Sequence, residues 1–301
     1  MVWWGTHGVR IDRVTLEVHA ALADRGIASI LLKGPSIAAW LYGLGELRRY
    51  GDSDFLIRRA DWDRAGDVLR GLGFAPKWDE GAHRGLGSYS SFPWQRDDEA
   101  VDLHATLSGL GAAHADVWAI LSSATVPQQI LDADIPVLAP APRAMHVALH
   151  AAQHHRFQDQ PRRDLEKAVA TVPTADWREA LAIAERLDGV AALAAGLRLV
   201  DGGHELATEL GVLEVSTVET RLREEWVPLA EGMNALLETP GLRAKLRTGL
   251  HEVVPSPAFM RWWSPLARRG PVGLLAAYLW RPVWLATRLP GALRAVRRAR
   301  R

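Results

Sequence analysis

The order of strand-like and helix-like segments constrains the fold of this chain more than any other feature. In the N-terminal part, short apolar runs typical of strands alternate with segments whose apolar residues recur at helical spacing. After the proline-rich stretch 136–142, the helical pattern continues to the C-terminus. Strands mixed with helices, followed by helices alone, predict an α+β domain and then an α-helical domain. We expect three regions: domains 1–139 and 140–270, and a basic aromatic segment 271–301.

The individual elements are predicted from apolar periodicity and from the glycines and prolines that begin or end helices. Strands are predicted at 27–32, 52–57, 75–78, 88–94, 100–105 and 135–138. Helices are predicted at 11–22, from Pro35 onward, and at 61–72, 143–157, 162–171, 176–188 and 190–200.

Composition excludes several classes of protein. The 301 residues are 48% hydrophobic and 24% charged, a balance that supports a sizeable core. Cysteine is absent, so disulfides and thiolate metal sites are excluded. The net charge of +1 argues against a general nucleic-acid binder. The N-terminus lacks the apolar run of a signal peptide, and we expect a cytoplasmic protein.

Asp52 and Asp54 begin a predicted strand with the sequence DSDFLI. Side chains alternate along a strand, so both carboxylates face one side while Phe55 enters the core on the other. Two adjacent carboxylates repel each other unless a cation lies between them, and their oxygens suit Mg²⁺ or Mn²⁺. The alternative is a solvated strand end, because Asp-x-Asp is common by chance.

Asp102 provides a third carboxylate on another predicted strand, EAVDLHA. There Val101 and Leu103 face one way, and Asp102 and His104 face the other. A lone carboxylate within an apolar strand is costly to bury without a charged partner. A metal ion held by Asp52 and Asp54 would be such a partner. His104 shares this face, and we interpret it as a hydrogen-bonded structural histidine.

The sequence LLKGPS joins a predicted strand to a predicted helix through a glycine. Gly34 allows the backbone to approach a ligand closely, and Lys33 and Ser36 place a charge and a hydroxyl beside it. The pattern is not that of a P-loop. An ordinary strand-to-helix turn is the alternative interpretation.

The order of these motifs resembles the nucleotidyltransferases of the DNA polymerase β superfamily, and especially its bacterial group of uncharacterised nucleotidyltransferases. The resemblance rests on LLKGPSIAAWLYG, then LRRYGDSDFLI, the Gly-Phe pair at 73–74 and the Asp-Leu-His strand at 102–104. It extends through a histidine-rich helix around 146–154, Asp164 and the Asp-Trp pair at 176–177. Residues 10–215 are covered, and the fold it implies is a polymerase-β-like domain with a mixed sheet.

The resemblance implies a role for each matching residue. Asp52 and Asp54 would bind two metal ions bridged to a nucleoside triphosphate such as ATP. Asp102 would help to hold the second ion and activate the acceptor hydroxyl. Gly34 and Ser36 would match the phosphate turn of the superfamily, although Pro35 separates them here, and Lys33 would add a charge.

Two further groups of side chains are candidates for binding. Arg48 and Arg49 precede the aspartate strand and could clamp the phosphates; a solvated loop is the alternative. His146, His150 and His154 lie four residues apart, with His155 alongside, so a helix would place them on one face. That face would line the acceptor side of the cleft, and a zinc site is the alternative.

The C-terminal segment 271–301 is apolar, aromatic and basic. Arg281 and Pro282 interrupt it, so it is not a membrane-spanning run. We expect a helix packed on its own domain with a disordered arginine tail. The alternative is contact with an anionic membrane surface.

Together these features predict a metal-dependent enzyme that transfers a nucleotidyl or related phosphoryl group from a nucleoside triphosphate. The acceptor is open: a small molecule, a peptide or a protein all fit. Relatives often lie beside biosynthetic genes, so the resemblance implies tailoring of natural products or polysaccharides. The alternative functions are an inactive interaction protein with the same fold and an antitoxin-like modifier of a partner protein.

Overall fold

The computed structural model describes residues 2–43, 46–77, 91–154 and 158–301 of the chain. They form two compact units: Met1–Ala75 with Ser90–Ser216, and Pro76–Tyr89 with Thr217–Arg301. The helices between 140 and 216 belong to the same unit as the sheet, and segment 271–301 belongs with the helices that precede it.

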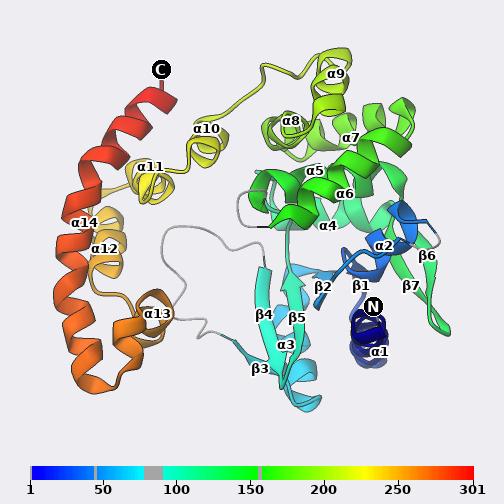
Figure 1. Cartoon of the computed structure of the whole chain (residues 1–301), viewed down its shortest axis with the longest axis horizontal. Helices are drawn as coiled ribbons and strands as arrows, with labels where there is room; N and C mark the ends of the chain where they lie inside the picture. Colours follow the sequence, from blue (N-terminus) through cyan, green and yellow to red (C-terminus); the bar gives the residue numbers. More distant parts are fainter. Residues whose placement is uncertain (1, 44–45, 78–90, 155–157) are drawn as a thin grey trace. The chain divides into compact units, whose positions relative to one another are not determined.

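A mixed sheet forms the centre of the first unit (Figure 1). Within the described residues it has seven strands in the order β3-β4-β5-β2-β1-β7-β6. β2 pairs in parallel with β5 and antiparallel with β1, which pairs in parallel with β7. The strands are β1 (Ser29–Leu31), β2 (Asp52–Ile57), β3 (Ala75–Pro76), β4 (Ser91–Arg96), β5 (Glu99–His104), β6 (Thr125–Ile130) and β7 (Ala133–Leu138).

Helices cover both faces of this sheet, with α5 to α8 gathered on one side and α1 on the other (Figure 1). The helices of the first unit are α1 (Val2–Asp24), α2 (Pro35–Leu41), α3 (Trp62–Gly71), α4 (His114–Ser123), α5 (Pro140–His154), α6 (Asp159–Thr171), α7 (Thr174–Arg186), α8 (Val190–Leu197) and α9 (Asp201–Glu209), with a short 3₁₀ turn, η1 (Arg59–Asp61).

The alternation along β2 divides the interior into two cores. Phe55 packs in a cluster with Val18 of α1, on one face of the sheet. Leu56 packs in another cluster with Met145 of α5, on the other face. Because successive side chains alternate, Asp54 lies on the face that α5 covers. The aspartates therefore point toward the helical layer.

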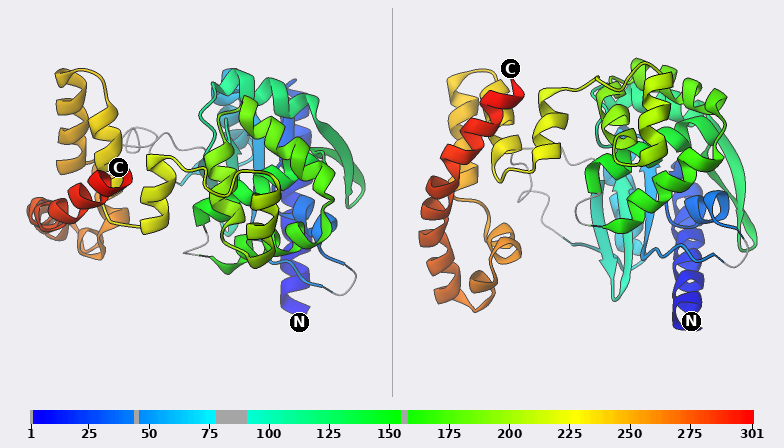
Figure 2. Two further views of the ribbon diagram at one scale, coloured as in Figure 1. Left: turned by 90° about the horizontal axis from the view of Figure 1, so that it is seen from above. Right: turned by 45° about the horizontal axis from the view of Figure 1, so that its top comes forward.

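Residues 217–301 of the second unit are helical. Its elements are α10 (Val218–Glu225), α11 (Ala230–Glu238), α12 (Leu242–Val253), α13 (Pro257–Trp263), the 3₁₀ turn η3 (Pro265–Arg268) and α14 (Pro271–Ala299). Figure 2 shows α14 as the longest helix of this unit, with the shorter helices beside it. Small residues of α14, among them Ala292 and Ala295, form one core with Leu222 and Ala230. None of the described helices combines the length and apolarity that a bilayer span requires.

The structure confirms an α+β fold and the order of the predicted elements, and it corrects one expectation. It also contains α4 and β6, which were not predicted. β6 is a polar edge strand that contains Pro127, and α4 buries only Val117 and Leu121, so neither has a strong apolar pattern. The arginine tail is not disordered: α14 continues through Pro282 to Ala299.

Some predicted positions lie outside the described residues. They are Trp78 at the end of one predicted strand, 88–90 at the start of the next, and 155–157, including His155, at the end of a predicted helix.

Candidate active site

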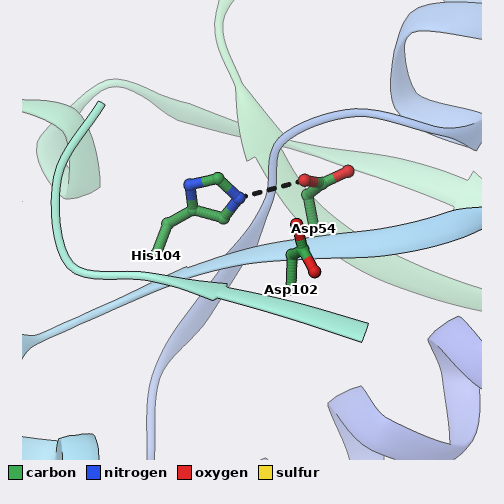
Figure 3. Close-up of side chains that lie close together, drawn as sticks. All are labelled: Asp54, Asp102 and His104. Carbon is green, nitrogen blue, oxygen red and sulfur yellow. Dashed lines mark hydrogen bonds and ion pairs between the residues drawn. The ribbon is translucent and has the colours of Figure 1, made fainter. Parts of the chain in front are cut away.

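The register between β2 and β5 brings the predicted carboxylates to one face of the sheet. Asp54 pairs with Asp102, and Leu56 pairs with His104, in a parallel ladder. Parallel neighbours at the same register point their side chains to the same face. The ligand atoms of Asp54, Asp102 and His104 all lie within 4.8 Å of one another. Figure 3 shows the His104 ring bonded to one oxygen of Asp54, with the Asp102 carboxylate beside them.

Asp52 lies two residues before Asp54 on β2, outside that group of three. The Asp54 carboxylate, followed by burial, raises the pKa of Asp52 to about 6. The Asp52 carboxyl is therefore close enough to Asp54 for the two charges to repel each other. Such repulsion is what a bound cation relieves.

Lys33 supplies the nearest positive charge to these carboxylates. Its Nζ lies 2.6 Å from Oδ1 of Asp54, and its side chain is only 13% exposed. Burial alone would raise the pKa of Asp54, but Lys33 and the hydrogen bond with His104 hold it below its ordinary value. Asp54 is therefore an ionised carboxylate in the interior.

His104 bonds to the same oxygen of Asp54, with its Nε2 3.0 Å from Oδ1. An ionised carboxylate can only accept, so Nε2 carries the proton and donates it. Burial lowers the pKa of His104, with the Asp54 charge opposing this shift, and a neutral ring leaves Nδ1 as an acceptor. The interpretation of His104 as a hydrogen-bonded histidine agrees with this contact.

Several buried polar atoms at this site have no hydrogen-bond partner among the described residues. They include Oδ2 of Asp54, Nδ1 of His104 and Nδ1 of His146. A buried polar atom without a partner costs free energy, so such atoms are rare in folded proteins. The second oxygen of a fully buried carboxylate fits a divalent cation, which takes oxygen ligands. The residues present therefore fit the metal ion that the sequence predicted.

The turn from β1 to α2 requires glycine. Gly34 has φ of +63°, and a Cβ on it would lie 3.3 Å from the main-chain oxygen of Asp52. This close approach places Lys33 beside the aspartates. Ser36 is fully buried, and its Oγ has no partner among the described residues. The phosphate-binding roles of Lys33, Gly34 and Ser36 stay predictions.

Arg48 lies in the interior rather than in a solvated loop. Its Nη2 lies 2.6 Å from Oδ2 of Asp164 on α6, and its Nε donates to both carboxylate oxygens at 3.0 Å. Its Nη1 donates to the main-chain oxygen of Gly34 at 3.3 Å. Tyr42 and Gln160 also donate to Asp164. In this structure the Arg48 guanidinium is bonded to the Asp164 carboxylate and to the main chain of the glycine turn.

Arg49 is exposed and lines a hollow together with Arg48, Tyr50 and Asp12. The Tyr50 ring lies next to Gly34, 3.6 Å from the position of a Cβ. The hollow therefore borders the glycine turn. The clamp role predicted for Arg48 and Arg49 stays a prediction for a ligand in this hollow.

Three histidines of α5 form the predicted row. The ring centroids of His146 and His150 are 6.1 Å apart, and those of His150 and His154 are 4.8 Å apart. Burial, then the charges of Lys33 and His104, lower the pKa of His146 to about 3. The row therefore begins close to the carboxylate site. Among the described residues, the cluster with metal-ligand spacing is that of Asp54, and the α5 histidines are not part of it.

Asp164 is a further residue whose importance the sequence shows only indirectly. It lies on the buried face of α6 with Pro161, Leu165 and Ala168. A carboxylate at an apolar position of an amphipathic helix needs a charged partner. That signal identifies Asp164 as paired, but it does not identify Arg48 as its partner.

Three solved structures resemble the chain at low identity. The antibiotic-resistance factor ANT(2'')-Ia is 12% identical, covers 58% of this chain and 91% of its own, and has a TM-score of 0.41. A nucleotidyltransferase-like protein from Paracoccidioides brasiliensis is 14% identical over 62% and 92%, with a TM-score of 0.32. A tRNA nucleotidyltransferase is 13% identical over 94% and 99%, with a TM-score of 0.26.

No curated protein matches the sequence. The family model described as "Uncharacterised nucleotidyltransferase" matches residues 6–202, which include the sheet, α5 and both buried ion pairs. The match spans well over half of the chain. The chain therefore belongs to this family of uncharacterised nucleotidyltransferases.

Proposed function

We propose that this chain transfers a nucleotidyl group from a nucleoside triphosphate to an acceptor hydroxyl, with Asp52, Asp54 and Asp102 holding Mg²⁺ or Mn²⁺. The observation that carries the proposal is Oδ2 of Asp54, a fully buried carboxylate oxygen without a partner among the described residues. Asp102 lies beside it on the neighbouring strand. Membership of the nucleotidyltransferase family supports the same reaction class.

In the proposed step, the acceptor oxygen attacks the α-phosphorus and the bond to the leaving pyrophosphate breaks. The proton of the hydroxyl passes to a carboxylate oxygen of Asp102, and pyrophosphate leaves with the bonding electrons. A divalent ion, when bound, neutralises the phosphate charge and stabilises the entering and leaving oxygens. Transfer of another phosphoryl fragment would use the same residues, with attack at a different phosphorus.

Lys33 has a defined part in this proposal. Its ammonium contacts one oxygen of Asp54 and leaves the other open to a cation. The same charge lies at the glycine turn, where the superfamily places its phosphates. Lys33 therefore keeps the carboxylates ionised and adds positive charge for the triphosphate. Ser36 and Arg49 are assigned to the phosphates on the same basis.

The histidine face of α5 is proposed to select the acceptor. His146 lies near Lys33 and His104, and His150 follows it one turn along the helix. Burial and the charge of Lys33 also lower the pKa of His150, so both rings are neutral at pH 7 and can donate and accept hydrogen bonds. Replacing His150 with alanine should weaken use of the acceptor more than binding of the nucleotide.

A cytoplasmic location is part of the proposal, because nucleoside triphosphates and Mg²⁺ are supplied there. Tailoring of a natural product or polysaccharide fits an enzyme with an open acceptor. The alternative of an inactive interaction protein is less favoured, because all three aspartates are present and two of them meet at one site.

The proposal can be tested without knowing the acceptor. Thermal unfolding of the full chain is measured with a panel of nucleoside triphosphates, with and without Mg²⁺. Stabilisation of about 2.7 kcal/mol is expected at one hundred times the dissociation constant. The gain should disappear in Asp52→Asn and Asp54→Asn but persist in Asp134→Asn, an exposed carboxylate of β7. Equal stabilisation without a divalent ion would contradict the proposal.

A further inference from the structure

Charge is distributed very unevenly along this chain. Residues 239–301 contain thirteen lysines and arginines but only one acidic residue, Glu252, a net charge of +12. The preceding 238 residues contain 23 basic and 34 acidic side chains. The near-neutral total therefore hides a strongly basic C-terminal region, which corresponds to α12, α13 and α14. A polyanionic partner is the expected consequence of such a charge.

The first half of α14 exposes a row of large apolar side chains and buries one arginine. Val272, Leu275, Leu279 and Val283 follow one another at spacings of three or four residues and are 81%, 61%, 70% and 48% exposed. Arg281, on the other side of the helix, is 2% exposed. A helix on the surface of a water-soluble domain has the reverse arrangement. The first half of α14 therefore presents a row of apolar side chains that the described residues of this unit leave exposed.

The buried Arg281 is held in place by its surroundings. Its Nε donates to the main-chain oxygen of Glu252 at 2.6 Å. Its guanidinium also lies over the rings of Phe259 and Trp263, 5.0 and 4.9 Å from their centroids. These contacts fix the rotation of α14 about its own axis. The exposure of the apolar row is therefore built into the packing of the unit.

A second row occurs on α12 in the same unit. Leu242, Leu246 and Leu250 lie four residues apart and are 72%, 63% and 66% exposed. Single exposed leucines are common on protein surfaces, whereas rows along a helix mark an interaction surface. Exposed arginines alternate with this row: Arg243 and Arg247 each follow one of its leucines. Two exposed tryptophans, Trp262 and Trp280, belong to the same region.

We infer that α12, α13 and α14 form a surface that docks on an anionic lipid membrane. Leucine and tryptophan side chains enter the boundary between headgroups and acyl chains, and the arginines contact lipid phosphates. A nucleic acid would use the positive charge but leave the leucine rows in water. A neutral protein surface would cover the leucines but would offer no negative charges to the basic side chains, whose net charge is +12. The combination of the two features selects the membrane surface.

The experiment is binding of the full chain to lipid vesicles, measured by flotation and by tryptophan fluorescence. Vesicles contain either phosphatidylcholine alone or phosphatidylcholine with phosphatidylglycerol. We expect at least about tenfold tighter binding to the anionic vesicles, with a loss of binding in high salt. A blue shift of the fluorescence should accompany binding, because Trp262 and Trp280 leave water.

Variants separate the apolar and the electrostatic contributions. Leu275→Glu combined with Leu279→Glu should lower binding at least tenfold, whereas Leu131→Glu, an exposed leucine of the first unit, should not. Arg294→Gln with Arg297→Gln should weaken binding to anionic vesicles only. Unchanged thermal unfolding shows that the variants fold, as expected for side chains that are mostly exposed.

Three results would overturn the inference. One is equal affinity for neutral and anionic vesicles, or none for either. Another is binding to an RNA or DNA duplex that is tighter than vesicle binding and insensitive to the leucine variant. The third is a stable dimer by light scattering that Leu275→Glu and Leu279→Glu convert to monomer, because a second copy would then cover the row.

Discussion

Two buried ion pairs of the first unit, Arg48–Asp164 and Lys33–Asp54, differ in how completely their hydrogen bonds are satisfied. Both oxygens of Asp164 accept from Arg48, and one of them also accepts from Tyr42 and Gln160. Asp54 accepts from Lys33 and His104 through a single oxygen, and its other oxygen has no partner among the described residues. Both carboxylates are almost fully buried.

We interpret the Arg48–Asp164 pair as structural and the Lys33–Asp54 pair as part of the ligand-binding site. Both carboxylate oxygens of Asp164 are occupied, and the contacts of this pair tie α6 to the loop before β2 and to Gly34. In the Lys33–Asp54 pair, one buried carboxylate oxygen lacks a partner among the described residues, which costs free energy. A bound cation would contact that oxygen and remove this cost. The two pairs should therefore respond to mutation in opposite ways: loss of stability at one, loss of ligand binding and activity at the other.

The largest effect is expected for Asp102→Asn. If Asp102 holds the metal as proposed, the variant should reduce metal-dependent pyrophosphate release by at least about 10³-fold, or about 4 kcal/mol of transition-state stabilisation. The melting temperature should change little. The matched control is Asp134→Asn, which should retain full activity. Comparable activity in both variants would contradict the assignment of this site.

Arg48→Met should mainly destabilise the fold. Breaking a buried pair leaves Asp164 without its counter-charge, at a cost of about 3–5 kcal/mol in the free energy of unfolding. The double variant Arg48→Met with Asp164→Leu should recover most of this loss, as measured by urea denaturation. Nucleotide binding to the refolded double variant then decides whether Arg48 also clamps phosphates. If the folded double variant binds the nucleotide more than about tenfold more weakly than the wild type, a loss of about 1.4 kcal/mol in binding free energy, the result would support a phosphate-clamping role for Arg48.

Asp52→Asn should stabilise the metal-free protein. The pKa of Asp52 is raised to about 6, so between its unfolded value of 3.8 and pH 6 the folded state binds more protons than the unfolded state. Stability is therefore lost as the pH rises through this window. The variant avoids that loss and should gain about 1–3 kcal/mol above pH 7, and little below pH 4. Mn²⁺ should stabilise the wild type but not the variant. An equal gain at all pH values would point to another cause.

Part of the geometry around Asp54 was predictable from local sequence. Because a strand has a fixed period of two, alternation along DSDFLI predicted that Asp52 and Asp54 share a face of their strand, and alternation along EAVDLHA predicted the same for Asp102 and His104. The bounds of β2 are also as predicted, at Asp52–Ile57. What the pattern did not contain was the register between β2 and β5, which only the folded sheet provides.

Long-range partners were not predictable. Arg48 meets Asp164 across 116 positions of sequence, and no local pattern near Arg48 distinguishes a buried arginine from a solvated one. In α14, a proline at 282 normally interrupts a helix, yet the helix continues through it. Its neighbour Arg281 is held by Glu252 and by the aromatic rings of α13. In both places tertiary contacts decide what the local sequence leaves open.

The smallest effect is expected at His104, where the question is whether the ring positions Asp54 or binds the metal directly. Its Nε2 donates to Asp54, so the ring orients a carboxylate that we propose holds the metal. Loss of such a partner typically weakens metal binding by about 10–100-fold. His104→Ala should show this loss, whereas His104→Gln, which can still donate through its amide, should lose less than about tenfold, or 1.4 kcal/mol. Mn²⁺ binding measured by calorimetry distinguishes the two variants. Equal, severe losses in both would mean that the imidazole itself is a ligand, since an amide does not replace it in that role.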